Sequence, residues 1–445
     1  MVNPVLRIRF RQTPIILGSI SAIVTSLTFS ASAMASTDTP SDIPASHDAP
    51  LHYVALGDSY SAGFGLMPFS ESPASGCFQA EANYPHLVAS ALGLDLDDRT
   101  CSGAVTANIM SAPQTTITGQ GVAPVQADSL SADTDIVTVS IGGNDLGFAD
   151  VAASCLAQAA DGPLFLPDFQ NCRSLYVQGS SHFEIDTLAA KLDGTVVPAL
   201  RQTFAVIAAK APNAKVFVVG YPAIAPNVEN VPAGGCFTPM INVDGTYPVN
   251  AFPFTRIDTG YLHQTEVRLD DAIRTAAEGA GATYISTLEQ TETHSACATT
   301  DPFISGITLV TSGSGTPTGI PGLSVALGAL HPNSAGVGFL ATKVGAAVAE
   351  AVNAPPPPTP TPIPAPTSSA PSLPDSRPGT TPGAPPTAVP APISPSPAVA
   401  AGSMSRPVLA KTGVDPLPLG LAGFVILIVG TLTITGARRR RTPRP

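Results

Sequence analysis

The sequence predicts an α/β fold in which a parallel sheet is covered by helices on both faces. Short apolar runs typical of buried strands occur at residues 53–57, 135–141 and 215–219, and each run meets a glycine at its end. Between these runs lie longer segments with the apolar spacing of helices. Because strands and helices alternate along the chain, the strands are expected to run parallel.

The first strand ends at Gly57-Asp58-Ser59, and a helix can open at residues 61–63. Ser59 is therefore expected at the carboxyl edge of the sheet, where open α/β sheets bind their ligands. A serine placed there can act as a nucleophile. In isolation, however, Asp58 and Ser59 can equally be ordinary helix caps, so other features must decide between the two interpretations.

The rest of the chain continues the alternation of helices and strands. Helices are expected at residues 84–92, 185–210, 261–280 and 334–352, and further strands at 94–101 and 283–286. The second of these helices is interrupted near Gly194 and Pro198, and the third is amphipathic.

Two more turns bring possible hydrogen-bond donors to the edge that carries Ser59. Gly103 follows the strand at 94–101, and a glycine lets its N–H approach a ligand closely. Asn144 lies in Gly142-Gly143-Asn144-Asp145 after the strand at 135–141, and its side-chain amide is a donor. Taken singly, each of these sequences is typical of an ordinary turn.

His331 is a possible general base. It stands in Ala329-Leu330-His331-Pro332-Asn333, and Pro332 disfavours helical backbone angles for the residue before it. This histidine is therefore expected on a loop that enters the last helix. A solvated surface histidine is the alternative, and only its position in the fold can decide.

The amino-terminal residues 1–35 have the pattern of a secretory signal peptide. Three arginines precede an apolar stretch, and Ala33-Met34-Ala35 supplies a small-residue cleavage site before Ser36. A retained membrane anchor is the alternative. Residues 354–408 are rich in Pro, Ala, Ser and Thr, a composition that cannot bury a core and favours an extended linker or stalk.

The carboxyl-terminal region resembles the sorting signal of Gram-positive cell-wall proteins. Leu-Ala-Lys-Thr-Gly at residues 409–413 precedes an apolar, transmembrane-length segment at 416–437 and a basic tail at 438–445. The resemblance implies that a sortase joins Thr412 to peptidoglycan. A permanent transmembrane tail is the alternative, and both place the protein at the cell surface.

The six cysteines all lie in the region that would be exported, and an even number in an oxidising compartment indicates disulfides. Sequence alone permits fifteen pairings. We expect neighbours in sequence to pair: Cys77–Cys101, Cys155–Cys172 and Cys236–Cys297. A metal site is the alternative, but the chain has no Cys-x-x-Cys motif or histidine-rich cluster. The formal net charge of −11 argues against a nucleic-acid partner.

Four sequence blocks together resemble those of the SGNH, or GDSL, hydrolases. They are Gly57-Asp58-Ser59-Tyr60, Gly103, Gly142-Gly143-Asn144-Asp145 and His331-Pro332-Asn333, in the order of the family and within residues 50–353. With six cysteines after a signal peptide, the chain is most similar to the secreted bacterial GDSL lipases and esterases. The resemblance implies a three-layer α/β/α sandwich with a flavodoxin-like parallel sheet.

The resemblance also implies a mechanism without a metal or another cofactor. Ser59 is the nucleophile, and His331 is the general base and then the general acid. The oxyanion hole consists of the Ser59 N–H, the Gly103 N–H and the Asn144 side chain. Many family members carry an aspartate three residues before the histidine, where this chain has Gly328. We expect the carbonyl of Gly328 to orient the His331 ring, which leaves a Ser-His dyad.

These features predict a secreted, surface-anchored esterase or lipase, expected to be a monomer, whose substrate is an acyl ester. Apolar residues that follow the nucleophile can line an acyl pocket or merely pack in the core: Phe64, Leu66, Met67 and Phe69. An O-deacetylase of acetylated glycans is one alternative. Another is a surface binding module built on an inactive hydrolase domain.

Overall fold

The computed structural model describes residues 49–353 except 167, 181–182, 312–314 and 319–321. Every described helix and strand belongs to the compact unit that begins at Pro50. Several predicted features lie outside the described residues: the signal peptide, the linker, the sorting motif with Thr412, the apolar segment and the basic tail.

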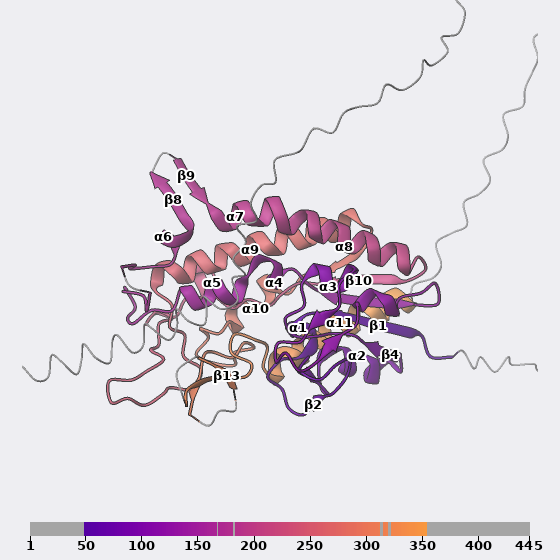
Figure 1. The fold of residues 1–445 in the computed structure, drawn as a ribbon, viewed down its shortest axis with the longest axis horizontal. Helices are drawn as coiled ribbons and strands as arrows, with labels where there is room; N and C mark the ends of the chain where they lie inside the picture. The colour runs from indigo at the N-terminus through magenta and orange to yellow at the C-terminus, as the bar shows by residue number, and fades with distance from the viewer. Residues whose placement is uncertain (1–48, 167, 181–182, 312–314, 319–321, 354–445) are drawn as a thin grey trace, which may run out of the picture. The chain divides into compact units, whose positions relative to one another are not determined.

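A parallel sheet lies at the centre of this unit (Figure 1). In spatial order its strands are β11 (Thr283–Ile285), β10 (Lys215–Val219), β7 (Ile136–Ser140), β1 (His52–Gly57) and β4 (Asp95–Asp98). All neighbouring strands pair in parallel. The second strand in sequence thus lies outside the first, which is the flavodoxin-like order. This confirms the predicted fold class.

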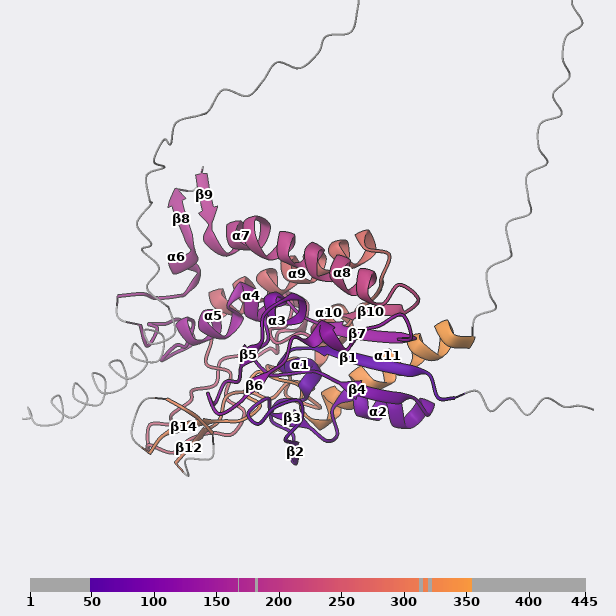
Figure 2. The same ribbon diagram turned by 45° about the vertical axis from the view of Figure 1, so that its right-hand side comes forward.

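Helices cover both faces of the sheet, as Figure 2 shows from a second side. One face packs against α3 (Thr106–Met110), α8 (Val197–Lys210) and α9 (Arg256–Gly279). The opposite face packs against α2 (Tyr84–Leu92) and α11 (Ser334–Asn353). The two cores follow from the strand period of two, because successive side chains point to opposite faces.

Alternate residues of β1 show this division. Val54 and Leu56 belong to the core under α8 and α9, whereas Tyr53 and Ala55 belong to the core over α2 and α11. The four side chains are fully buried. Helix α11 is long and apolar enough to cross a membrane by length and composition, but its buried residues pack in the second core.

The predicted helix at 185–210 is more complex than its spacing indicated. It begins later, with α7 (Thr187–Lys191), passes through a π-helical turn at Leu192–Val196 and continues as α8. The π-helical turn contains Gly194, where an interruption was expected, and Pro198 lies in the first turn of α8. A π-bulge adds a residue without ending the helix.

The helix expected to open after Ser59 is a single turn, α1 (Ser59–Ala62). It ends at Gly63, whose left-handed φ of 73° is typical of a helix end. The remaining helices are also short: α4 (Gly143–Leu146), α5 (Phe148–Ser154), α6 (Arg173–Tyr176) and α10 (Leu288–Thr291).

Small antiparallel pairs lie outside the main sheet. They are β2 (Phe69–Ser70) with β3 (Gln79–Ala80), β5 (Gln114–Thr115) with β6 (Val122–Ala123), and β8 (Val177–Ser180) with β9 (Phe183–Asp186). A three-stranded sheet contains β12 (Leu309–Val310), β14 (Ser324–Ala326) and β13 (Gly315–Pro317). This last sheet precedes the loop that carries His331.

The structure joins the cysteines in the predicted pairs: Cys77–Cys101, Cys155–Cys172 and Cys236–Cys297. No free cysteine remains among the described residues, which include all six. Removing a native disulfide from a small secreted domain typically costs about 2–5 kcal/mol.

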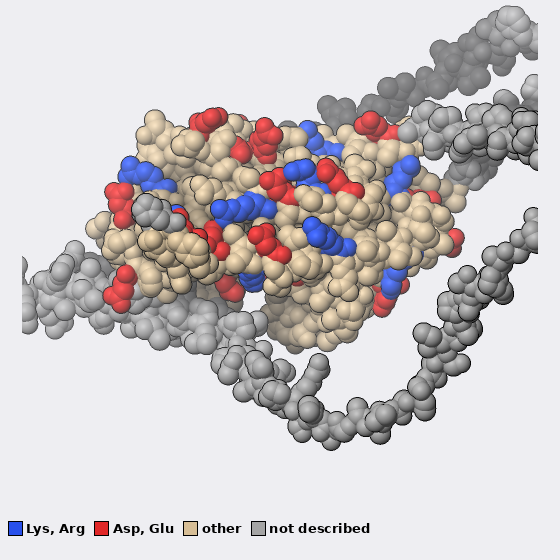
Figure 3. Space-filling model, turned by 90° about the horizontal axis from the view of Figure 1, so that it is seen from above, with Lys and Arg blue, Asp and Glu red and all other residues tan. Residues whose placement is uncertain are grey.

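The outer face over α8 and α9 is charged but mixed in sign. Figure 3 shows acidic and basic side chains interspersed on this face. Arg268 of α9 pairs with Asp186 at 2.5 Å, and Arg274 pairs with Asp271 at 2.7 Å. Helix α9 is therefore amphipathic: charged residues cover its outer side, and its apolar side faces the core.

Candidate active site

Ser59 stands at the first position of α1, and one residue, Asp58, separates it from the end of β1. The turn depends on Gly57, whose φ is 138° and where a Cβ would lie 2.6 Å from the Ser140 carbonyl oxygen. The Asp58 carboxylate accepts a hydrogen bond from the Tyr60 N–H at 3.0 Å and so caps the turn. Ser59 retains 9% of its exposure. Asp58 is thus the residue that caps α1, and the Ser59 hydroxyl is not used as a helix cap.

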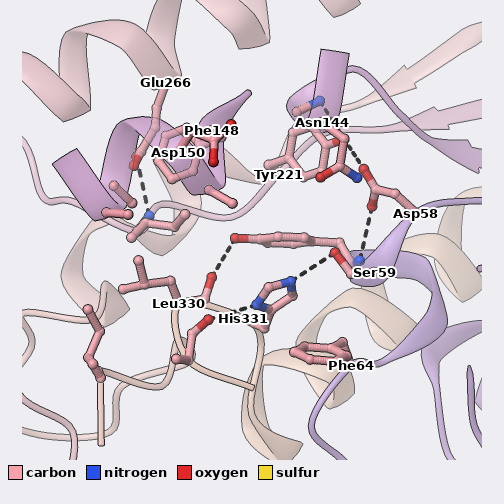
Figure 4. A pocket seen from close by; sticks show the side chains of 18 of the residues that line it. Asp58, Ser59, Phe64, Asn144, Phe148, Asp150, Tyr221, Glu266, Leu330 and His331 are labelled. Atoms are coloured by element: carbon pink, nitrogen blue, oxygen red, sulfur yellow. Dashed lines mark hydrogen bonds between the residues drawn. The ribbon is translucent and has the colours of Figure 1, made fainter. Parts of the chain in front are cut away.

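The structure brings His331 to Ser59, from the loop between β14 and α11. Its Nε2 lies 2.8 Å from the Ser59 Oγ, and its Nδ1 lies 2.8 Å from the Ala329 carbonyl oxygen (Figure 4). Because a carbonyl only accepts, Nδ1 carries the proton in the neutral ring. Nε2 is then the acceptor for the serine proton.

The prediction that Gly328 orients the ring is wrong, because the acceptor of the ring N–H is the carbonyl of Ala329. The Gly328 carbonyl accepts instead from the main-chain N–H of His331 at 3.0 Å. Two left-handed residues, Gly328 and Leu330, have φ of 84° and 58° and fold the loop tightly. The ring therefore turns back onto the carbonyl two residues before it.

Aromatic side chains enclose the His331 ring. Tyr60 lies on it at 5.0 Å between ring centroids, and Phe64 lies at the same distance. Removal from water lowers the pKa of His331 to about 4, although the hydrogen bond to Ala329 acts in the opposite direction. The imidazole is therefore neutral near pH 7, the form that a general base needs.

Asn144 lies at the start of α4, after β7, and lines the same cavity as Ser59. Its Nδ2 donates to the Ala104 carbonyl at 2.9 Å, which orients the amide. A primary amide has a second N–H that this bond does not use. The next residue, Asp145, accepts from the Thr106 N–H at 3.0 Å and ties the turn to α3.

Gly103 is less closely associated with the cavity. It lies in the turn after β4 with a φ of 84°, and a Cβ there would lie 2.7 Å from a methyl group of Ile117. It is not among the residues that line the cavity, whereas Ser59, Asn144 and His331 are. Among the described residues, the N–H groups of Ser59 and Gly103 have no acceptor.

Ser59 and His331 line a cavity of about 480 Å³ whose lining is mostly apolar. Its large apolar residues come from several elements: Phe64, Phe148, Leu156, Ile224, Met240, Leu269, Leu288, Ile307, Val325 and Leu330. Of the four residues expected as a possible acyl pocket, only Phe64 lines it. Met67 is 72% exposed. The lining is shared between helices, such as α5 and α9, and loops that follow other elements.

Glu266 is an acidic residue of the cavity that sequence reasoning missed. It is buried on α9 and accepts hydrogen bonds from the N–H groups of Ile224 and Ala225 at 3.2 Å each. Burial raises its pKa to about 8. The signal was available, because Glu266 interrupts the apolar stripe formed by Leu262, Leu269 and Ile273.

Asp58 and Tyr221 are two further polar residues whose importance the sequence did not show. The Tyr221 hydroxyl donates to the Asp58 carboxylate at 2.6 Å. Burial raises the pKa of Asp58 to about 7. The described residues contain no group of three or more His, Cys, Asp or Glu side chains that could hold a metal ion.

Comparisons with known proteins show the family to which the chain belongs. Residues 55–338 match the model of the GDSL-like lipase/acylhydrolase family. Lipase 2 of Streptomyces coelicolor is 34% identical over 255 residues, which cover 57% of this chain and 75% of that protein. An esterase of Streptomyces scabiei is 29% identical over 278 residues, 58% of this chain and 76% of its own.

Among solved structures, phospholipase A1 from Streptomyces albidoflavus is similar at 26% identity and a TM-score of 0.45. It aligns over 66% of this chain and 100% of its own. The family match spans most of the chain, including the Ser59 and His331 blocks. This chain therefore belongs to the GDSL-like lipase/acylhydrolase family and is a hydrolase of ester bonds.

Proposed function

We propose that the protein hydrolyses acyl esters through a covalent acyl-enzyme on Ser59, with a Ser-His dyad. The observation that carries this proposal is the 2.8 Å contact between Ser59 Oγ and His331 Nε2 at the wall of an apolar cavity. A serine hydroxyl is a weak nucleophile until a neighbouring base takes its proton. The contact supplies that base at hydrogen-bond distance.

The reaction begins when Ser59 Oγ attacks the ester carbonyl carbon and His331 Nε2 takes the hydroxyl proton. The carbonyl oxygen becomes an oxyanion, which the Ser59 N–H and the second Asn144 amide N–H can stabilise. His331 then protonates the departing alcohol, and the acyl group stays on Ser59. A water molecule, deprotonated by the same imidazole, attacks the acyl carbon, and His331 returns the proton to Ser59.

The Gly103 N–H is proposed as the third oxyanion donor. Its support is indirect: the adjacent Ala104 carbonyl holds the Asn144 amide at 2.9 Å, so both donors belong to one hydrogen-bonded unit. Removal of a single oxyanion-hole donor costs about 3–4 kcal/mol of transition-state stabilisation.

The dyad is completed by a main-chain carbonyl. Ala329 O accepts the Nδ1 proton of His331 and fixes the ring tautomer. A neutral carbonyl stabilises the imidazolium that forms during the reaction less than a carboxylate does. Burial between Tyr60 and Phe64 also disfavours the imidazolium, because it lowers the pKa of His331, and the base is therefore neutral in the resting enzyme.

The substrate is proposed to be an ester with an apolar acyl chain. An apolar cavity of about 480 Å³ is larger than an acetyl group needs. The relatives named lipases support the same substrate class. Acetylated glycans remain the competing substrates, because the same catalytic groups remove acetyl esters.

A chain-length series tests this proposal. The purified protein is assayed with p-nitrophenyl acetate, octanoate and dodecanoate, with Ser59→Ala as the control. The proposal expects kcat/KM to be at least tenfold higher for octanoate than for acetate and to vanish in Ser59→Ala. Highest activity on acetate contradicts the acyl-chain proposal. Undiminished activity in Ser59→Ala contradicts the serine mechanism.

We also propose that the protein is secreted and held at the cell surface by its carboxyl-terminal region, through a bond from Thr412 to peptidoglycan. The support is the pattern at both ends of the sequence. Amino-terminal sequencing should find a mature chain that begins near Ser36. Wall digestion, but not detergent, should release the chain. Release by detergent with the arginine tail intact contradicts wall attachment.

A further inference from the structure

Tyr221 lies where three parts of the site meet. It follows β10 in Gly220-Tyr221-Pro222, and its side chain lies beside Asp58 and Asn144 (Figure 4). Its hydroxyl donates to Asp58 Oδ2 at 2.6 Å and accepts from the Gly143 N–H at 3.1 Å. One phenol group therefore joins two turns that are 85 residues apart in sequence.

The two partners of this hydroxyl are the immediate neighbours of reacting groups. Asp58 precedes Ser59, and Gly143 precedes Asn144. A shift of either partner therefore moves the nucleophile or the proposed oxyanion donor. The Tyr221 side chain also lies in van der Waals range of Gly143, because a Cβ there would lie 3.4 Å from the Tyr221 ring and hydroxyl.

The ring of Tyr221 extends the connection to the general base. It packs edge-on against Tyr60, with 4.9 Å between ring centroids and an interplanar angle of 80°. The Tyr60 hydroxyl donates to the Leu330 carbonyl at 2.7 Å, and the Tyr60 ring lies on His331. Leu330 precedes His331. A tyrosine hydroxyl therefore bonds the residue before the general base, just as Tyr221 bonds the residues before Ser59 and Asn144.

We infer that Tyr221 is a positioning residue, which sets the Asn144 donor, the Ser59 nucleophile and the His331 base at their mutual distances through Asp58, Gly143 and Tyr60. The inference rests on the proposed serine mechanism. Its hydroxyl uses its proton on Asp58 and accepts the Gly143 N–H, so its role is exerted through these neighbours rather than on the substrate. Since misplacement of a reacting group by about 1 Å can cost 10²-fold in rate, such a bridge affects catalysis strongly.

The test compares Tyr221→Phe with Tyr176→Phe. Both substitutions delete one hydroxyl from a partly buried ring. Among the described residues the Tyr176 hydroxyl bonds only to Ser154, at 2.8 Å, and neither of these two residues lines the cavity. Tyr221→Phe is expected to lower kcat for p-nitrophenyl octanoate by about 10- to 100-fold, with KM within about threefold of wild type. Tyr176→Phe is expected to keep wild-type kcat. A folded Tyr221→Phe with kcat within twofold of wild type overturns the inference.

A second measurement separates positioning from general weakening of the fold. An alkylboronic acid forms a tetrahedral adduct with a serine hydroxyl, so its affinity reports on the oxyanion donors. Tyr221→Phe should weaken this affinity in proportion to kcat. In an Asn144→Ala background the same substitution should have a clearly smaller effect, because Tyr221 acts in part through this donor. Full additivity of the two losses contradicts the positioning of Asn144 by Tyr221.

Asp58→Asn is the alternative variant if Tyr221→Phe fails to fold. The Tyr60 N–H and the Tyr221 hydroxyl donate to the two different oxygens of Asp58. Asparagine replaces one of these oxygens by an NH2 donor, so one of the two bonds is lost, and kcat should fall with KM unchanged. Wild-type kcat in Asp58→Asn overturns the inference. Ser59→Ala is assayed in parallel, because turnover in that variant would contradict the proposed function itself, whatever the result for Tyr221.

Discussion

The nucleophile side and the base side of the site are built in different ways. The nucleophile side, with Ser59 and Asn144, stands on the ends of parallel strands and is fixed by side-chain hydrogen bonds from Tyr221 and to Ala104. The base side is the loop of residues 327–333, which is held largely through main-chain carbonyls. Strand ends place a side chain by sheet register, whereas an irregular loop needs its own turn geometry.

The His331 loop shows how much such turn geometry matters. Leu330 N–H donates to the Ser305 carbonyl at 2.9 Å, and Ser305 N–H donates to the His331 carbonyl at 3.0 Å. These reciprocal bonds, together with the Tyr60 hydroxyl on the Leu330 carbonyl, hold the imidazole over Ser59. A side chain of the nucleophile side, Tyr60, therefore helps to hold the base side.

The largest effect is expected from removing the base. His331→Ala should lower kcat by on the order of 10³-fold or more, because Ser59 loses its proton acceptor. The matched control is His294→Ala, which removes a half-buried imidazole that contacts Asp301 and Phe303. Steady-state kinetics on one ester checks both variants. A His331→Ala variant within tenfold of wild type would remove the imidazole from the mechanism.

The next largest effect is expected on the nucleophile side. Asn144→Ala should lower kcat by about 10²- to 10³-fold with little change in KM, because an oxyanion donor acts mainly in the transition state. Asn108→Ala is the control, since Asn108 makes only local bonds in and around α3. Equal losses in the two variants would mean that Asn144 is structural.

A carboxylate installed at the family position should not improve the base side. Gly328 has a φ of 84°, and a Cβ there would lie 3.1 Å from the Gly65 Cα. We expect Gly328→Asp to lower unfolding free energy by about 1–3 kcal/mol and kcat by roughly tenfold.

Gly119→Asp separates backbone strain from this close contact. Gly119 also has a left-handed φ, 70°, but a Cβ there would meet no other atom within 4 Å. Its loss of stability should be smaller, and its kcat unchanged. Thermal denaturation and kinetics check the pair. Higher kcat in Gly328→Asp would show that the loop accepts an acid after all.

The smallest effect is expected from mild acidification. Burial holds the pKa of His331 at about 4, below its usual 6.5, and only the neutral imidazole accepts the serine proton. The rate constant kcat/KM should therefore stay nearly constant from pH 7 to about 5 and fall as the pH passes through 4. Circular dichroism at each pH confirms that the fold persists. Asp58 has a pKa of about 7, so Asp58→Asn is measured in parallel. Half-loss of activity near pH 6.5 in both proteins would mean that the His331 ring is solvated.

The sequence indicated the nucleophile side well and the base side only in part. Gly57 and the apolar run before it place Ser59 at a strand end, and the β-branched run before Gly142 does the same for Asn144. Pro332 places His331 on a loop, but the left-handed Leu330 that selects the Ala329 carbonyl has no signature in the sequence. The Gly328 prediction failed by one residue for that reason.

Other parts of the site depend on long-range packing. Tyr221 stands in an ordinary turn sequence, and its two hydrogen bonds exist only because β10 is the neighbour of β7 in the sheet. Several large apolar residues of the cavity, Ile224, Met240 and Ile307, stand on loops whose positions no periodic pattern predicts. The strands and the long helices, by contrast, could be inferred from local patterns. The cysteine pairs followed only from the expectation that neighbours in sequence join.

The identity of the attacking oxygen is tested most directly by covalent labelling with an alkyl fluorophosphonate, followed by peptide mass analysis. The account predicts one phosphonate per chain on the peptide that contains Ser59, none in Ser59→Ala and much slower labelling in His331→Ala. Label on a different residue, or ester hydrolysis by a protein whose Ser59 remains unlabelled after complete inhibition, would contradict it.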